Sequence, residues 1–91
     1  MKYQVKYSKD FKKGLKKLKN DTQSIELTKS IITKLANDEP LEPKHKDHKL
    51  TGQYESFREC HIKPDLLLIY KKEERVLILT CLAIGSHSEL F

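Results

Sequence analysis

Three apolar runs in the C-terminal half of the chain constrain its fold more than any other feature of the sequence. They lie at 56–62, 65–71 and 76–83, and each has the length and the β-branched or aromatic content of a strand. The connections at Lys63-Pro64 and Lys72–Glu74 are far shorter than the dozen or so residues that a parallel crossover needs. The sequence therefore predicts an antiparallel meander.

The N-terminal half has the pattern of a short strand followed by two helices. Apolar and polar residues alternate at 3–7, which is typical of a half-buried strand. Helical spacing predicts a helix over Lys9–Lys19, capped by Ser8 and weakened by Gly14, and a second helix over Thr22–Asn37. We therefore expect an α+β fold, with the short strand and helical hairpin packed on one face of the C-terminal antiparallel sheet. The opposite face of the sheet is then free for function.

The chain is short and basic. Its 91 residues predict a single domain, 1–91, because so short a chain cannot support two cores. The net charge of +5 indicates a polyanionic partner, which by charge alone is a nucleic acid, an anionic membrane surface or an acidic protein. A solvated helix face is an equally good interpretation of the crowded lysines in the first half. These lysines are Lys9, Lys12, Lys13, Lys16, Lys17 and Lys19.

Cysteine spacing and hydropathy indicate a reducing, aqueous compartment. Cys60 and Cys81 lie far apart in apolar stretches, and we expect both to be buried, reduced thiols. Residues 1–6 contain no apolar core of a signal peptide, and the apolar stretch Val76–Ile84 is too short for a membrane span. We therefore expect a cytoplasmic protein.

Histidines beside carboxylates in the second half form the most informative cluster of polar residues. Imidazole titrates near neutral pH, so this combination is typical of proton transfer. Strand periodicity places Glu59 and His61 together on the open face, while Cys60 and Ile62 point to the core. The four histidines are His45, His48, His61 and His87.

Several neighbouring residues allow two interpretations each. Asp65 follows the Lys63-Pro64 turn close to His61, where it either orients the imidazole or caps backbone groups of the turn. Arg58 either reaches a sheet edge or pairs with an acid. The segment Gly85–Phe91 is either a frayed tail or supplies the Phe91 ring for stacking on an unpaired base.

A metal site is a weaker alternative. His45, Asp47 and His48 lie close together in the sequence, and His61 could complete a ligand set. The loop that holds the first three is rich in lysine, which repels cations. We therefore expect no metal.

Three motifs of the C-terminal half resemble one known family. They are D-H-x-L-x-G at 47–52, [FY]-R-[DE]-x-H-[IV]-x-P-D at 57–65, and G-[ST]-H at 85–87. In this order they resemble the YafQ branch of the RelE/ParE toxin superfamily. The similarity extends over essentially the whole chain, although Leu66 departs from the aromatic residue that is frequent in the family.

The resemblance implies a RelE-like toxin fold and an endoribonuclease toxin of a type II toxin-antitoxin system. Such a toxin cleaves messenger RNA in the ribosomal A site with the ribose 2′-hydroxyl as nucleophile, without metal or other cofactor. The implied catalytic set is His48, His61, Asp65 and His87. We expect His87 to be the general acid and the other three to share the base and positioning roles. The implied substrate contacts are Glu59, Phe91, Arg58 and the helix lysines Lys12, Lys13 and Lys16.

The resemblance also implies partners. These are messenger RNA, the ribosome with its 16S rRNA, and a cognate antitoxin, a DinJ-like DNA-binding dimer whose C-terminal segment wraps the toxin. The toxin is expected to be monomeric when free and heterotetrameric with its antitoxin, and no membrane is involved. Three rival interpretations are a ParE-like toxin that poisons gyrase, a non-catalytic basic RNA-binding module, and a metal-binding protein.

Overall fold

The computed structural model describes residues 2–52 and 55–91. Within these described residues the order is a strand, two helices, a 3-10 turn, four strands and a last short helix. The elements are β1 (Gln4–Tyr7), α1 (Lys9–Lys16), α2 (Thr22–Ala36), η1 (Pro43–His45), β2 (His48–Lys49), β3 (Arg58–Lys63), β4 (Leu66–Glu73), β5 (Ile78–Gly85) and α3 (His87–Leu90).

The strands form one five-stranded sheet in the order β1-β5-β4-β3-β2. The predicted meander is confirmed, because β3, β4 and β5 pair antiparallel through short turns. The N-terminal strand β1 pairs parallel with β5, so the sheet as a whole is mixed. The short strand β2, which pairs antiparallel with β3, lies in a segment that we expected to be a loop.

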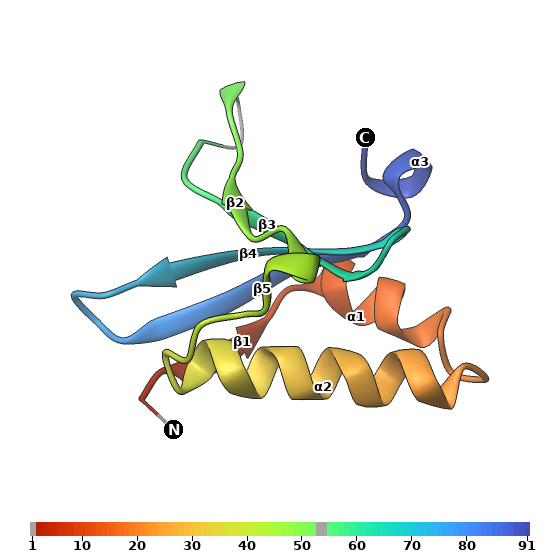
Figure 1. Ribbon diagram of the computed structural model, residues 1–91, viewed down its shortest axis with the longest axis horizontal. Coiled ribbons are helices and arrows are strands. Elements are labelled where there is room, and N and C mark those ends of the chain that lie inside the picture. Colours follow the sequence, from red (N-terminus) through yellow and green to blue (C-terminus); the bar gives the residue numbers. More distant parts are fainter. Residues whose placement is uncertain (1, 53–54) are drawn as a thin grey trace.

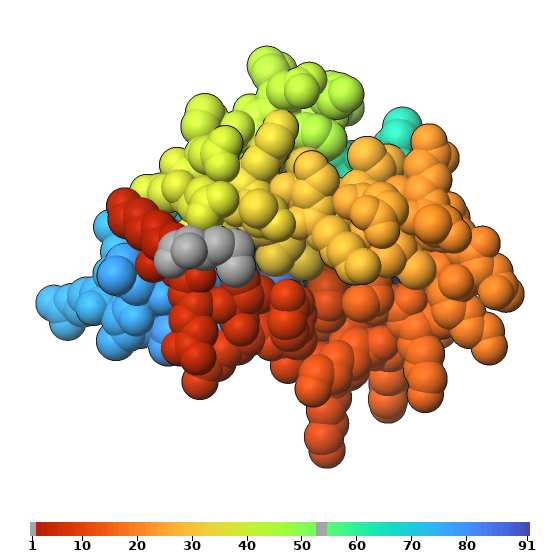
Figure 2. Space-filling model, turned by 90° about the horizontal axis from the view of Figure 1, so that it is seen from below, coloured from red at the N-terminus to blue at the C-terminus, as the bar shows by residue number. Residues whose placement is uncertain are grey.

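The predicted helical hairpin covers one face of this sheet. Figure 1 shows α1 and α2 on the same side of the strands, and Figure 2, seen from that side, shows both helices spread over it. Asp21 caps α2 by accepting hydrogen bonds from the backbone N and the hydroxyl of Ser24, at 3.1 and 2.6 Å. The hydroxyl of Thr28 donates to the Ser24 carbonyl at 2.7 Å, so these buried polar side chains are satisfied.

Gly14 allows α1 to lie directly on β5. A Cβ atom at this position would be 2.2 Å from the carbonyl oxygen of Ile84, which is backbone and cannot move aside easily. The glycine that we expected only to weaken the helix therefore permits a close helix–strand contact. Ser8 caps α1 as predicted, accepting from the Phe11 backbone N at 3.0 Å, but the helix ends at Lys16, earlier than expected.

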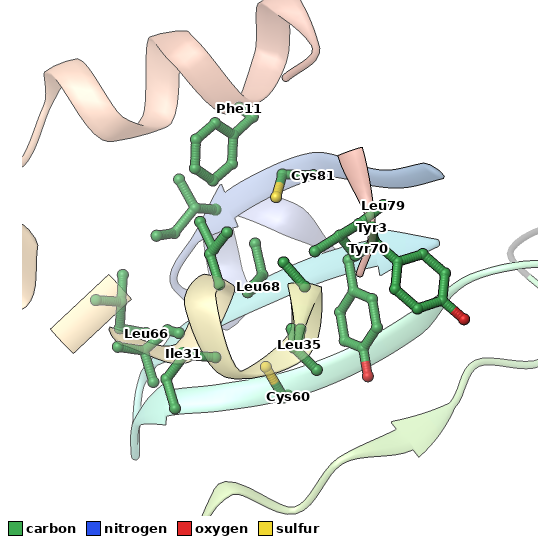
Figure 3. Close-up of a cluster of buried hydrophobic side chains, with 14 residues drawn as sticks. Tyr3, Phe11, Ile31, Leu35, Cys60, Leu66, Leu68, Tyr70, Leu79 and Cys81 are labelled. Carbon is green, nitrogen blue, oxygen red and sulfur yellow. The ribbon is translucent and has the colours of Figure 1, made fainter. Parts of the chain in front are cut away.

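The hydrophobic core lies between α2 and the sheet (Figure 3). Ile31 and Leu35 of α2 point onto Leu66 and Leu68 of β4, and the two cysteines are buried and free as predicted. Burial raises the pKa of both thiols, to about 12. Leu66, the residue that departs from the family pattern, is a core residue with 8% of its surface exposed. Among the described residues, no helix is long and apolar enough to cross a bilayer.

Candidate active site

Neighbouring ends of strands bring the predicted site residues together on the sheet face opposite α2. His48 of β2 lies directly across the ladder from Glu59 of β3. In β4, Leu67 pairs with His61 on one side and with Gly85 of β5 on the other, so α3 begins close to the end of β3. Figure 1 shows the β2–β3 arm and α3 rising from the same face of the sheet.

Glu59 links two of the histidines. Its side chain is buried, and its Oε1 lies 3.7 Å from Nε2 of His48 and 3.5 Å from Nε2 of His61. The periodicity argument, which placed Glu59 and His61 on one face, is therefore consistent with the observed positions. One buried carboxylate oxygen therefore lies within 4 Å of an imidazole nitrogen of each histidine.

The orientation of His48 is set by its own loop. Its Nδ1 lies 2.6 Å from the carbonyl oxygen of Lys46, and a carbonyl oxygen only accepts, so Nδ1 carries the proton. Lys46 adopts the left-handed conformation, with φ 45° and ψ 45°, at the end of η1. In the neutral ring, Nε2 on the Glu59 side is then the basic nitrogen.

Asp65 holds His87. Its Oδ1 accepts from the backbone N of His87 at 3.1 Å and lies 3.0 Å from Nδ1 of the same residue. The side-chain hydrogen bond with His87 lowers the pKa of Asp65, so this carboxylate is ionised at neutral pH. We expected Asp65 beside His61; the contacts of the described residues join it to His87 instead, whose ring meets that of His61 edge-on at 5.7 Å between centroids.

The C-terminal segment is a helix turn and not a frayed tail. Ser86 and Glu89 form a capping box, in which the Ser86 backbone N donates to Glu89 Oε1 at 2.8 Å. The backbone and side-chain hydrogen bonds of Ser86 lower the pKa of Glu89, followed by the hydrogen bond of Lys17, the C-cap of α1, at 3.4 Å. The S-x-x-E spacing was the signal for this turn in the sequence. Phe91 is 58% exposed beyond it, and its stacking on a base stays a prediction.

Arg58 points to the other side of β3. Its Nε lies 3.2 Å from Oδ1 of Asp47 and 3.3 Å from the hydroxyl of Tyr70, which itself donates to Asp47 at 2.5 Å. Of the two interpretations of Arg58, the structure shows pairing with an acid. Burial, with the Asp47 carboxylate second, raises the pKa of Tyr70. The predicted phosphate contact of Arg58 stays a prediction.

The predicted helix lysines lie on a different element. Lys12, Lys13 and Lys16 are exposed on α1, and among the described residues no contact joins them to the histidines. Their contact with substrate stays a prediction.

His45 is the site residue that sequence reasoning missed. Its side chain is buried, and its Nδ1 lies 2.6 Å from the carbonyl oxygen of His61. The carbonyl accepts, so Nδ1 of His45 donates. Because β2 pairs with β3 only at Arg58 and Glu59, η1 supplies a donor to the edge of β3 beyond that point.

The geometry changes which residues could bind a metal. The residues that the sequence suggested have other partners, as described for His45, Asp47 and His48. Among the described residues, Glu59, His61 and His87 instead offer one carboxylate and two imidazole ligand atoms within 4.8 Å of one another. We call these three residues the ligand trio. Copper, nickel and zinc suit such N/O donors.

Comparison with known proteins identifies the family. The model of the family described as "Bacterial toxin of type II toxin-antitoxin system, YafQ" matches residues 3–91. The chain belongs to the YafQ toxin family. The mRNA interferase toxin YafQ of Escherichia coli K12 is 36% identical over 90 residues, covering 98% of this chain and 91% of its own length.

Solved structures agree with this assignment. A metal-bound toxin from Helicobacter pylori has a TM-score of 0.90 and 44% identity, covering 98% of this chain and 99% of its own. The E. coli DinJ–YafQ complex matches with a TM-score of 0.86 and 31% identity, covering 98% of each chain. The RelE-like toxin fold that the resemblance implied is confirmed.

Proposed function

We propose that this YafQ-family toxin is a ribosome-dependent endoribonuclease that cleaves messenger RNA in the A site by metal-independent acid–base catalysis. The paired orientation of His48 and His87 carries the proposal. In each ring Nδ1 is held by an oxygen, a carbonyl for His48 and a carboxylate for His87, so that Nε2 is left for proton transfer. The related E. coli protein is named an mRNA interferase, which supports the same activity.

His48 is the general base in this mechanism. Nε2 of the neutral ring takes the proton of the ribose 2′-hydroxyl while the 2′-oxygen bonds to phosphorus. The imidazolium that results lies 3.7 Å from Glu59, whose carboxylate offsets the new charge. His61, on the other side of the same carboxylate, is placed to steady the charged phosphorane.

His87 is the general acid. The bond between phosphorus and the 5′-oxygen breaks, and Nε2 of His87 gives its proton to that oxygen. The products are a 2′,3′-cyclic phosphate and a 5′-hydroxyl end. Asp65 positions the ring through Nδ1 and stabilises the protonated form that the step requires.

The partners follow from the family. We propose a cognate antitoxin for this chain, as DinJ is for E. coli YafQ in the solved complex. The activity places the toxin in the cytoplasm, where messenger RNA is translated, in contact with the 16S rRNA that lines the A site.

Transcript end-mapping in a translation extract tests the proposal. We expect codon-spaced cuts with wild-type toxin only when ribosomes are present, and none with His87→Ala or His48→Ala of unchanged circular dichroism. Wild-type cleavage rates in His87→Ala would refute its role. Gyrase-linked DNA breaks in place of messenger cuts would support the gyrase-poison interpretation.

Metal binding is the second candidate activity, favoured by the ligand trio and by the metal-bound state of the H. pylori relative. A bound metal would supply Lewis-acid chemistry at this position. However, an imidazole nitrogen that coordinates a metal cannot also transfer a proton. Metal binding at the trio therefore competes with acid–base catalysis by the same residues.

A further inference from the structure

A groove runs between α2 and the segment that precedes β2, and the proposed mechanism leaves it without a role. Its volume is about 750 Å³, within the range of sites that hold a small ligand. One wall is α2, and the other walls are η1 with its flanking residues and the β3–β4 turn. We call it the α2 groove. Its lining residues include Lys34 of α2, Lys44 and Lys46 around η1, and Lys63 and Pro64 at the turn.

The lining of the α2 groove is strongly cationic. Four lysines line it against a single carboxylate, that of Glu42, which lies 3.7 Å from Lys44. Lys63 has weak partners, Gln23 at 3.5 Å and Asp21 at 3.9 Å. Lys34 and Lys46 have no ion pair within the described part of the chain. The groove therefore carries uncompensated positive charge.

Apolar side chains lie among these lysines. Leu27 of α2 and Pro64 of the β3–β4 turn supply the apolar surface of the groove, and the core residues Ile31 and Ile62, which are almost fully buried, border it. Charged ammonium groups beside apolar surface suit a single-stranded nucleic acid. The ammonium groups bind its phosphates, and the apolar surface contacts its sugars and bases. A uniformly charged ligand would leave the apolar part unused.

The α2 groove is continuous with the candidate active site. His61 and His87 line it, and both belong to the proposed catalytic set. An RNA strand whose scissile phosphate lies at these histidines can therefore either continue into the groove or leave the protein surface at that point. The positive charge of the groove favours the first course.

We propose that the α2 groove binds the sugar-phosphate backbone of about one or two nucleotides next to the scissile phosphate. This inference rests on the proposed ribonuclease function and extends it to a binding site on α2. Lys34 and Lys44 neutralise phosphates there, and the apolar wall contacts the riboses or bases. His45 also lines the groove, and its 2.6 Å hydrogen bond to the His61 carbonyl links the groove to the active site.

The test is the salt dependence of RNA binding. The probe is a fluorescein-labelled RNA decamer with 2′-O-methyl riboses, which lacks the nucleophile and cannot be cut. The variant is Lys34→Gln with Lys44→Gln, because glutamine has a helix propensity close to that of lysine and keeps a polar side chain while removing the charge. The control is Lys6→Gln with Lys19→Gln, which removes the same charge from exposed residues outside the groove.

Each phosphate contact to a single strand contributes about 0.7 to the slope of log K against log salt. Loss of two contacts should lower that slope by about 1.4, so the binding defect of the groove variant should shrink about sevenfold between 50 and 200 mM salt. The control should keep the wild-type slope. In the translation extract the groove variant should need more toxin for half-maximal cutting, with the same cut sites.

Equal slopes for the groove variant and the control would overturn the proposal. A groove variant that binds RNA normally but loses affinity for the acidic segment of an antitoxin would also overturn it, and would assign the groove to a protein partner. The binding measurement uses uncleavable RNA, so it is independent of catalysis. Absence of messenger cleavage by wild-type toxin would therefore refute the ribonuclease function. The RNA-binding role of the groove would still be decided by the salt dependence of binding.

Discussion

His45 offers the sharpest test of how this site is held in place. The carbonyl oxygen of His61 receives a 2.6 Å hydrogen bond from the buried Nδ1 of His45, at an edge of β3 that β2 does not cover. His45→Phe keeps an aromatic ring of similar size and removes the donor. A buried acceptor that loses its donor costs about 1–3 kcal/mol. For a chain of this length, the melting temperature should fall by roughly 4–24 °C.

The catalytic effect should exceed the effect of stability alone. Without the donor, the His61 backbone is free to shift, and a displacement of about 1 Å in an active site can cost roughly a hundredfold in rate. We expect kcat to fall by about tenfold to a hundredfold at a temperature where the variant is fully folded. KM should change less, because the lysines of the α2 groove are untouched.

His45→Asn is the matched control, because the side-chain amide of asparagine can place a donor near the position of Nδ1. It should recover much of kcat, although its smaller side chain recovers less of the stability. The assay is cleavage kinetics in a translation extract beside thermal unfolding followed by circular dichroism. A His45→Phe protein that is less stable but has wild-type kcat would refute the positioning role and leave the contact purely structural.

Three further predictions concern the fold and the metal. Gly14→Ala should lower the free energy of unfolding by about 1–3 kcal/mol despite the better helix propensity of alanine, since its Cβ meets the Ile84 carbonyl; a more stable variant in urea unfolding would contradict the close contact. Hydrogen bonds from Lys2 and Lys72 lower the pKa of Asp38 from 3.8 to about 2. Its contribution to stability is therefore full above about pH 4 and is lost as the pH falls through 2, and urea midpoints of Asp38→Asn should fall less steeply over that range than those of the wild type. Cupric ion should inhibit messenger cleavage by binding the ligand trio, and a chelator should restore activity. Full activity while electron paramagnetic resonance shows bound copper would refute the competition between metal binding and acid–base catalysis.

Much of the architecture was predictable because it depends on local pattern. Alternation and short connections gave the β3–β5 meander, and helical spacing gave α1 and α2 to within a few residues. The parallel pairing of β1 with β5 was not predictable in this way, since it depends on where α1 and α2 return the chain. The role of Gly14 was missed for the same reason, because only the docked position of α1 on β5 reveals the close approach.

In the candidate site, too, features that depend on local pattern were predictable, and features that depend on tertiary contacts were not. Periodicity alone placed Glu59 and His61 on one face, because alternation is a property of a single strand. The partner of Asp65 could not be read from its neighbours in sequence: the hairpin brings it near His61, but the end of β5 brings His87 closer. His45 was left out of the predicted catalytic set because it lies outside the three family motifs. Its contact with the His61 carbonyl could not be predicted, because any residue at position 61 would supply the same carbonyl.

Contacts with a backbone atom help to orient each of the three histidines of the proposed catalytic set. The Lys46 carbonyl fixes Nδ1 of His48, the imidazole of His45 fixes the carbonyl of His61, and Asp65 fixes both the backbone N and the ring of His87. The three rings are thus oriented by the loop at Lys46, by the 3-10 turn η1 and by the capped turn α3. The strand β2, which carries His48, has only two residues. Substitutions that keep the catalytic set and alter only His45 or the loop around Lys46 should therefore slow cleavage by changing the orientation of His61 and His48.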